Sequence, residues 1–199
     1  MNVIFDLGGV VFNWDPDRLI AEIFENKEIH PIVRSGIINH HDWVDLDRGI
    51  LSEEEAIKRG SKRTGVPEAK LREFMQAVPP FLTPIDESLQ LVKDLKNNGN
   101  KLYVLSNMHI ASITHLENKY PFWHFFDGKV ISCRINKVKP EKDIYQHLLG
   151  RYQLNIDETV FIDDTDINLK TATDLGMMTI KFENPDQCRK ELENLGCLS

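Results

Sequence analysis

Four short apolar runs in this chain are each followed by residues that can do chemistry. Asp6 follows residues 3–5, Ser106 and Asn107 follow 102–105, Lys139 lies a few residues beyond 130–131, and Asp163 and Asp164 follow 160–162. A carboxylate such as Asp6 can attack a phosphoryl group and form a covalent intermediate. A hydroxyl, an amide and an ammonium can hold the oxygens of that group, which is the stabilisation that phosphoryl transfer chiefly needs. The residue types therefore indicate phosphoryl transfer, provided that they share one site.

A carboxylate that approaches a phosphate dianion needs positive charge around it. A hard divalent cation held by oxygen ligands supplies that charge most directly. Asp164 is the natural second ligand beside Asp6, and the Gly8 carbonyl can serve as a third, because Mg²⁺ keeps several of its waters. We therefore expect a Mg²⁺ site made by Asp6, Gly8 and Asp164.

Such residues can meet only if the apolar runs are strands of one parallel sheet. After residue 84, helical patterns and short apolar runs alternate at the spacing of βαβ units, which predicts a parallel sheet flanked by helices. The predicted strands span 3–6, 101–105, 129–132, 159–162 and 178–182, and the predicted helices span 84–98, 112–118, 141–149, 168–175 and 186–195. Loops at the carboxyl ends of such strands converge on one crevice, so we expect a Rossmann-like α/β fold with the site at that edge.

The stretch between the first strand and the rest of the sheet is expected to be helical. It has apolar stripes at helical spacing and no convincing strand. Ser52 and Glu55 stand at the spacing of a capping box, and Thr83 and Pro84 are predicted as the N-cap and first residue of the next helix. We therefore predict an α/β core domain of residues 1–14 and 84–199, with a small helical cap domain of residues 15–83 acting as a lid.

The four motifs resemble those of a known superfamily. Residues 5–10 read Phe-Asp-Leu-Gly-Gly-Val, 104–107 Val-Leu-Ser-Asn, 139–141 Lys-Pro-Glu, and 161–168 Phe-Ile-Asp-Asp-Thr-Asp-Ile-Asn. In type, order and strand placement they resemble the haloacid dehalogenase-like (HAD) hydrolases, in the small helical-cap subgroup that includes bacterial α-D-glucose-1-phosphate phosphatases. The resemblance implies a Mg²⁺-dependent phosphatase that acts on a small phosphorylated metabolite, such as a sugar phosphate like glucose 1-phosphate. A cytoplasmic location is expected on separate grounds, because the sequence leaves no room for a signal segment and has no apolar run long enough for a membrane span.

The resemblance also implies roles for single residues. It makes Asp6 the nucleophile that accepts the phosphoryl group, and Ser106 and Lys139 the catalytic residues that bind this group. It places Mg²⁺ on Asp6, the Gly8 carbonyl and Asp164. Asn107 and Asn168 would shape the site, with the Asn107 amide on the substrate. Asp163 would orient Lys139 or a metal-bound water.

One position departs from the pattern of the superfamily. Most of its phosphatases carry a second aspartate two residues after the nucleophile, as general acid and base, and Gly8 stands there instead. Loss of a general acid–base costs about 10²–10⁴-fold in rate. Two alternatives therefore stay open: a metal-independent 2-haloacid dehalogenase-type hydrolase, and a catalytically weak phosphate-binding or regulatory protein. His109 and Asp15 are candidate substitutes, although a surface or helix-entry position for His109 and a helix cap for Asp15 are the simpler interpretations.

Composition limits the partners and the compartment. With 24 Lys and Arg against 31 Asp and Glu, the net charge is -7, which argues against general binding to nucleic acid or to an anionic membrane. Cysteines 133, 188 and 197 show no zinc or redox spacing, which fits reduced thiols in a cytosol. A strand that begins near residue 2 leaves no room for a signal segment before Asp6, and no apolar run approaches the ~20 residues of a membrane span.

The part of the site that would recognise the body of the substrate is less determined. In the predicted cap, Trp43 can offer an aromatic face to a sugar, and Arg34 and Arg48 can bind an anion, although Trp43 equally fits a core position. The apolar stripes of the cap are explained by its own small core as well as by a second copy. Monomer and homodimer both stay open.

Overall fold

A parallel sheet of five strands forms the centre of the protein, as residues 1–198 of the computed structural model describe it. The strands are β1 (Asn2–Phe5), β2 (Lys101–Ser106), β3 (Gly128–Ile131), β4 (Thr159–Asp163) and β5 (Met178–Lys181), in the spatial order β3-β2-β1-β4-β5. Every neighbouring pair is parallel. The α/β fold expected from the alternation of strands and helices is confirmed.

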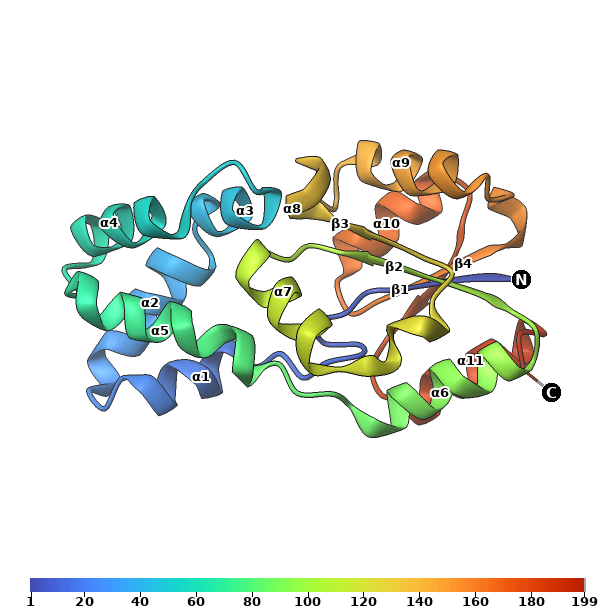
Figure 1. The fold of residues 1–199 in the computed structure, drawn as a ribbon, viewed down its shortest axis with the longest axis horizontal. Coiled ribbons are helices and arrows are strands. Elements are labelled where there is room, and N and C mark those ends of the chain that lie inside the picture. The colour runs from blue at the N-terminus through green and yellow to red at the C-terminus, as the bar shows by residue number, and fades with distance from the viewer. Residues whose placement is uncertain (199) are drawn as a thin grey trace.

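Helices cover both faces of this sheet (Figure 1). On one face, α6 (Asp86–Asn97), α7 (Ile110–Lys119) and α11 (Pro185–Asn194) pack on the inward side chains, and on the other face α9 (Lys142–Tyr152) and α10 (Asp166–Asp174) do so. Alternate residues of β1 point to opposite faces, and Val3, Ile4 and Phe5 are all fully buried. Burial on both faces explains why the strand sequences show no polar alternation. Three short helical segments complete this part of the chain: η3 (Pro121–Phe125), α8 (Ser132–Ile135) and η4 (Ile156–Glu158).

Residues 15–83 form a separate group of helices at the end of the sheet toward which β1 runs (Figure 1). They are α1 (Pro16–Ile23), η1 (Lys27–Ile29), α2 (His30–Val33), the π-helical η2 (Arg34–Ile38), α3 (His41–Arg48), α4 (Glu53–Thr64) and α5 (Glu68–Phe81). These helices enclose a hydrophobic cluster of their own, which includes Leu19, Ile57 and Phe74. The Ser52 hydroxyl accepts a hydrogen bond from the Glu55 backbone N–H at 3.2 Å, so the capping interaction expected at the start of α4 is present.

The predicted helix start at Thr83 and Pro84 is wrong, since α6 begins at Asp86. Thr83 and Pro84 belong instead to the segment that returns from the helical group, and this segment pairs with the outgoing one. The Asn13 N–H donates to the Thr83 carbonyl at 2.8 Å, and Phe12 forms an antiparallel bridge with Pro84. This pairing holds the backbone extended, which local helix signals cannot reveal. The strand predicted over 129–132 ends at Ile131 because α8 begins at the next residue.

No helix within residues 1–198 combines the length and the apolar character that crossing a membrane requires.

Candidate active site

The register of the sheet brings the polar residues at the strand ends side by side. Phe5 of β1 pairs with Val104 of β2 and with Ile162 of β4, so Asp6 stands level with the ends of both neighbouring strands. The Asp6 N–H donates to the Ile162 carbonyl at 2.9 Å, which extends the pairing to the carboxylate residue itself. The side chains that follow these strands therefore share one edge of the sheet.

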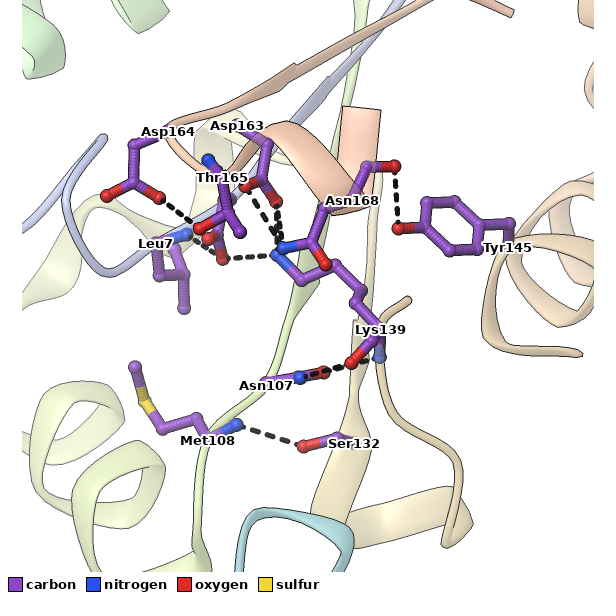
Figure 2. A network of polar contacts seen from close by, with 11 residues as sticks. Leu7, Asn107, Met108, Ser132, Lys139, Tyr145, Asp163, Asp164, Thr165 and Asn168 are labelled. Atoms are coloured by element: carbon purple, nitrogen blue, oxygen red, sulfur yellow. Dashed lines mark hydrogen bonds and ion pairs between the residues drawn. The ribbon is translucent and has the colours of Figure 1, made fainter. Parts of the chain in front are cut away.

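Lys139 links two of the carboxylates. Its ammonium Nζ lies 2.9 Å from Asp6 Oδ1 and 2.6 Å from Asp163 Oδ2, although its side chain is almost entirely buried. Figure 2 shows the lysine pointing toward Asp163, with Asn107 beside its backbone. The Asn107 amide donates to the Lys139 carbonyl at 2.9 Å and accepts from the Lys139 N–H at 2.8 Å. Asn107, predicted as a substrate contact, thus uses its amide to fix the loop that carries the lysine.

Asp163 is the most heavily bonded carboxylate of the group. It is fully buried and accepts hydrogen bonds from the Thr165 N–H at 2.8 Å and from the Asn168 amide at 3.1 Å, besides its ion pair with Lys139. Tyr145 in turn donates to the Asn168 carbonyl at 3.0 Å (Figure 2). With its oxygens occupied in this way, Asp163 is placed to orient Lys139, one of the two roles expected for it.

The cluster carries more negative than positive charge. Carboxylate oxygens of Asp6, Asp163 and Asp164 lie within 4.8 Å of one another. Among residues 1–198, Lys139 is the cationic side chain that forms ion pairs with this group, through Asp6 and Asp163. Burial raises the pKa of Asp6 to about 7, with Lys139 opposing that rise and Asp163 adding to it. Burial also raises the pKa of Asp164, again helped by Asp163. Burial would lower the pKa of Lys139, but Asp6 and Asp163 outweigh it and the pKa is raised. A hard divalent cation fits this oxygen-rich, net negative group.

Two adjacent glycines form the wall of this cluster, and they differ in what a side chain would meet. Gly9 has φ +78°, and a Cβ built on it would lie 2.2 Å from Asp164 Oδ2. The Asp164 carboxylate therefore packs directly against the Gly9 backbone. A Cβ on Gly8 would find its nearest neighbour, Trp14 Cβ, at 3.7 Å, an ordinary van der Waals distance. Gly8 thus has room for a Cβ in van der Waals contact with Trp14, whereas Gly9 does not.

The Ser106 hydroxyl also belongs to this edge of the sheet. It is buried, and it has no hydrogen-bond partner among residues 1–198. An unsatisfied buried hydroxyl costs about 1–3 kcal/mol, which a ligand oxygen would recover.

A cavity of about 80 Å³ opens beside Gly8, between the helical group of residues 15–83 and the start of α7. Trp14 and Trp43 stack at 6.0 Å on its wall, and Asp47 and His109 supply its titratable groups. His109 occupies the N-cap position of α7, the helix-entry position expected for it, yet it is only 4% exposed. Its contact with Asp47 was not predicted from the sequence, because it depends on how the helical group sits against the sheet.

Two other candidates have local partners. Asp15 caps α1, where it accepts from the Arg18 N–H at 3.0 Å, as its simpler interpretation expected. Arg34 lies 3.5 Å from Asp17.

Arg48 lies where the helical group of residues 15–83 meets the helices that flank the sheet. It makes a bidentate pair with Glu141 at 2.8 and 2.6 Å, next to the loop of Lys139. The guanidinium predicted to meet a substrate anion is thus engaged in joining α3 to the segment before α9.

Comparison with known proteins places this geometry in context. A family model described as haloacid dehalogenase-like hydrolase matches residues 1–176. The sesquiterpene phosphatase astK of Aspergillus oryzae is 26% identical over 195 residues, covering 98% of this chain and 96% of that protein. The D-ribitol-5-phosphate phosphatase of Bacteroides thetaiotaomicron is 24% identical over 204 residues, covering 96% of each.

A solved structure has the same fold. A HAD family enzyme from Bacteroides thetaiotaomicron gives a TM-score of 0.71 at 25% identity, covering 90% of this chain and 91% of that one. The same enzyme in complex with magnesium and inorganic phosphate gives a TM-score of 0.67 at 23% identity, covering 90% and 92%.

Proposed function

The chain belongs to the haloacid dehalogenase-like hydrolase family, and we propose that it is a Mg²⁺-dependent phosphatase that forms an aspartyl-phosphate on Asp6. The observation that carries this proposal is the buried group of three carboxylates around one lysine, which lacks positive charge. The unpaired Ser106 hydroxyl beside it supports the same reading, since a phosphoryl oxygen would satisfy it. A metal-independent dehalogenase has no need for this accumulation of carboxylates.

Each residue has a defined task in this proposal. Asp6 attacks phosphorus, and Ser106 and Lys139 hold the phosphoryl oxygens as negative charge moves onto them. Asp6, the Gly8 carbonyl and Asp164 would hold Mg²⁺, which supplies the charge that lets a carboxylate approach a phosphate.

The helical group of residues 15–83 is proposed to act as a cap domain over this site. It lies at the end of the sheet where the candidate residues gather, and it supplies Trp43, Asp47 and Val78 to the cavity beside Gly8. A cap in this position would shield the aspartyl-phosphate from bulk water.

The same cavity limits the substrate that we propose. None of the described residues that line it is a lysine or an arginine, and Asp47 contributes a carboxylate. A second anionic group on the substrate would therefore be repelled, whereas a neutral alcohol could pack on the tryptophans and hydrogen-bond to the polar groups. Two relatives are named sesquiterpene phosphatase and D-ribitol-5-phosphate phosphatase. Both names are consistent with a substrate that is the phosphate ester of a neutral alcohol. Within this class, sugar and polyol phosphates, glucose 1-phosphate included, are the proposed substrates.

The test is phosphate release from a panel of phosphomonoesters, with Mg²⁺ or with EDTA. The panel contains glucose 1-phosphate, D-ribitol 5-phosphate, glycerol 3-phosphate, a prenyl phosphate, p-nitrophenyl phosphate and phosphoglycolate, which carries a carboxylate as a second anionic group. We expect multiple turnovers that require Mg²⁺, disappear in Asp6→Asn and persist in Asp174→Asn, which removes an exposed carboxylate of α10. Absence of turnover on every ester would refute the phosphatase, and turnover of 2-chloropropionate in EDTA would establish the dehalogenase alternative.

A further inference from the structure

We propose that His109, oriented by Asp47, is the catalytic acid–base that replaces the side chain missing at Gly8. The inference rests on the proposed phosphatase function and adds to it the group that protonates the leaving oxygen. His109 stands at the start of α7, which packs on the sheet, and Asp47 belongs to α3, so the pair joins the sheet-bearing part of the chain to the helical group of residues 15–83.

The histidine is buried and held at both ring nitrogens. Nδ1 lies 3.3 Å from Asp47 Oδ1, and Nε2 lies 3.0 Å from the Ser112 hydroxyl. The Trp43 ring stands edge-on to the imidazole, with centroids 5.6 Å apart and an interplanar angle of 85°. These contacts fix the plane of the ring, and a carboxylate on Nδ1 is the partner that stabilises an imidazolium and sets its orientation.

The carboxylate is itself anchored through its backbone. The Ser132 hydroxyl donates to the Asp47 carbonyl, and the Asn136 amide donates to the next carbonyl, that of Arg48, at 3.0 Å. Both donors lie at α8, just beyond β3. The position of Asp47 over the site is therefore determined by the sheet domain, although the residue belongs to the helical group.

The pair faces the space that Gly8 leaves free. Gly8, Asp47, His109 and Ser112 line the same cavity, and a Cβ on Gly8 would meet nothing closer than Trp14 at 3.7 Å. In the described chain, the titratable groups on that lining are Asp47 and His109. Imidazole is the side chain most often used for general acid–base catalysis. Ser112, the present partner of Nε2, lies in the same cavity, so a leaving oxygen placed there could take its position.

The two half-reactions balance on this residue. As Asp6 attacks, the bond between phosphorus and the ester oxygen breaks, its electron pair stays on that oxygen, and the imidazolium gives it a proton to release the alcohol. Water then attacks phosphorus of the aspartyl-phosphate, and the neutral imidazole takes its proton. The bond between phosphorus and Asp6 breaks with its electron pair on the carboxylate. Phosphate leaves, and both residues return to their starting states.

The experiment compares esters that differ in their need for a proton. Alkyl phosphates such as glycerol 3-phosphate release a basic alkoxide, whereas p-nitrophenyl phosphate releases a stable phenolate without protonation. In His109→Gln we expect kcat/KM for glycerol 3-phosphate to fall by about 10²–10⁴-fold, and kcat/KM for p-nitrophenyl phosphate to change less than about threefold. Because the same residue activates water, p-nitrophenyl phosphate should also give a burst of nitrophenolate equal to one per active site.

Further variants separate catalysis from structure. Asp47→Asn should also lower kcat/KM for glycerol 3-phosphate more than for p-nitrophenyl phosphate. The loss should be smaller than in His109→Gln, since Asp47 acts by positioning His109. Gly8→Asp in the His109→Gln background should recover at least tenfold of the activity on glycerol 3-phosphate, because the added carboxylate points into the same cavity. His124→Gln, at an exposed position of η3, should match the wild type on both esters.

The outcomes distinguish failure of the role given to His109 from failure of the proposed phosphatase function. Equal losses on both esters in His109→Gln, or no loss on either, with wild-type circular dichroism, would overturn the role of His109 and leave the phosphatase intact. If His109→Gln does not fold, Asp47→Asn decides by the same criterion. A wild-type protein that turns over no ester of the panel in Mg²⁺ would overturn the proposed function and this inference with it.

Discussion

Asp6→Asn should stabilise the metal-free protein at high pH, even though it removes the nucleophile. Burial raises the pKa of Asp6 from its ordinary value of 3.8 to about 7. Between these two values the folded state holds a proton that the unfolded state has lost, so stability falls as pH rises through this window. A difference of about three pH units at ~1.4 kcal/mol each gives a penalty that reaches about 4 kcal/mol above pH 7.

Asparagine removes this penalty while keeping the local contacts. Its amide oxygen can accept the hydrogen bond that the Leu7 N–H donates to Asp6 Oδ1 at 2.7 Å. Lys139 then stays paired one-to-one with Asp163 at 2.6 Å. We therefore expect Asp6→Asn in EDTA to exceed the wild type at pH 8 by up to about 4 kcal/mol in unfolding free energy, and to match it near pH 4.

Urea unfolding at pH 4, 5, 6, 7 and 8 in EDTA measures this difference. Subtracting the wild-type curve from that of the variant cancels the titrating groups that do not interact with Asp6, and Asp174→Asn should show no comparable gain. Mg²⁺ should reduce the advantage of the variant, since it binds the ionised wild-type site more tightly. A variant that is less stable than the wild type at pH 8, or a difference that does not change with pH, would refute the account of the site as a buried excess of carboxylates.

Three further predictions concern residues around the site and the pair that docks α3. Gly9→Ala, whose Cβ would stand 2.2 Å from Asp164 Oδ2, should lower Mg²⁺-dependent turnover on the order of 10²-fold, whereas Gly8→Ala should keep the wild-type melting temperature. Lys139→Ala leaves buried carboxylates without their cation and should lower the free energy of unfolding in EDTA by about 3–5 kcal/mol, partly restored by Mg²⁺ in the same urea titration. Arg48→Ala and Glu141→Gln should each lower kcat/KM for alkyl phosphates by loosening the docking of α3, and a double-mutant cycle on stability should give a coupling of at most about 1 kcal/mol, because the pair is partly exposed.

Local sequence signals were sufficient to predict where a side chain lies when its position depends only on the strand that carries it. An apolar run that ends in Asp6 or Asp163 is placed by the sheet, and parallel pairing brings such ends together whatever the loops do. The prediction at Thr83 and Pro84 was wrong because the signal there is local, while the conformation depends on pairing with Asn13.

The contact between Asp47 and His109 joins residues 62 positions apart across the boundary of the helical group. Neither propensity nor periodicity determines how that group docks, so no feature of the printed sequence could reveal the pair. Asn107 illustrates the same limit within the sheet-bearing part of the chain, since Lys139 lies 32 positions away. Its residue type suits a phosphoryl oxygen, but only the path of the 139 loop shows that its amide is bonded to the Lys139 backbone.

Moving the acid–base from position 8 to His109 changes what controls the reaction. An aspartate beside the nucleophile would belong to the sheet domain alone and would be present however the helical group stood. The orienting carboxylate of His109 lies on α3, and its place depends on contacts with α8 and on the pair between Arg48 and Glu141. Protonation of the leaving group would then require the docked arrangement of the two groups. Loosening α3 should consequently slow alkyl phosphates more than p-nitrophenyl phosphate, the same selectivity that is expected of His109→Gln.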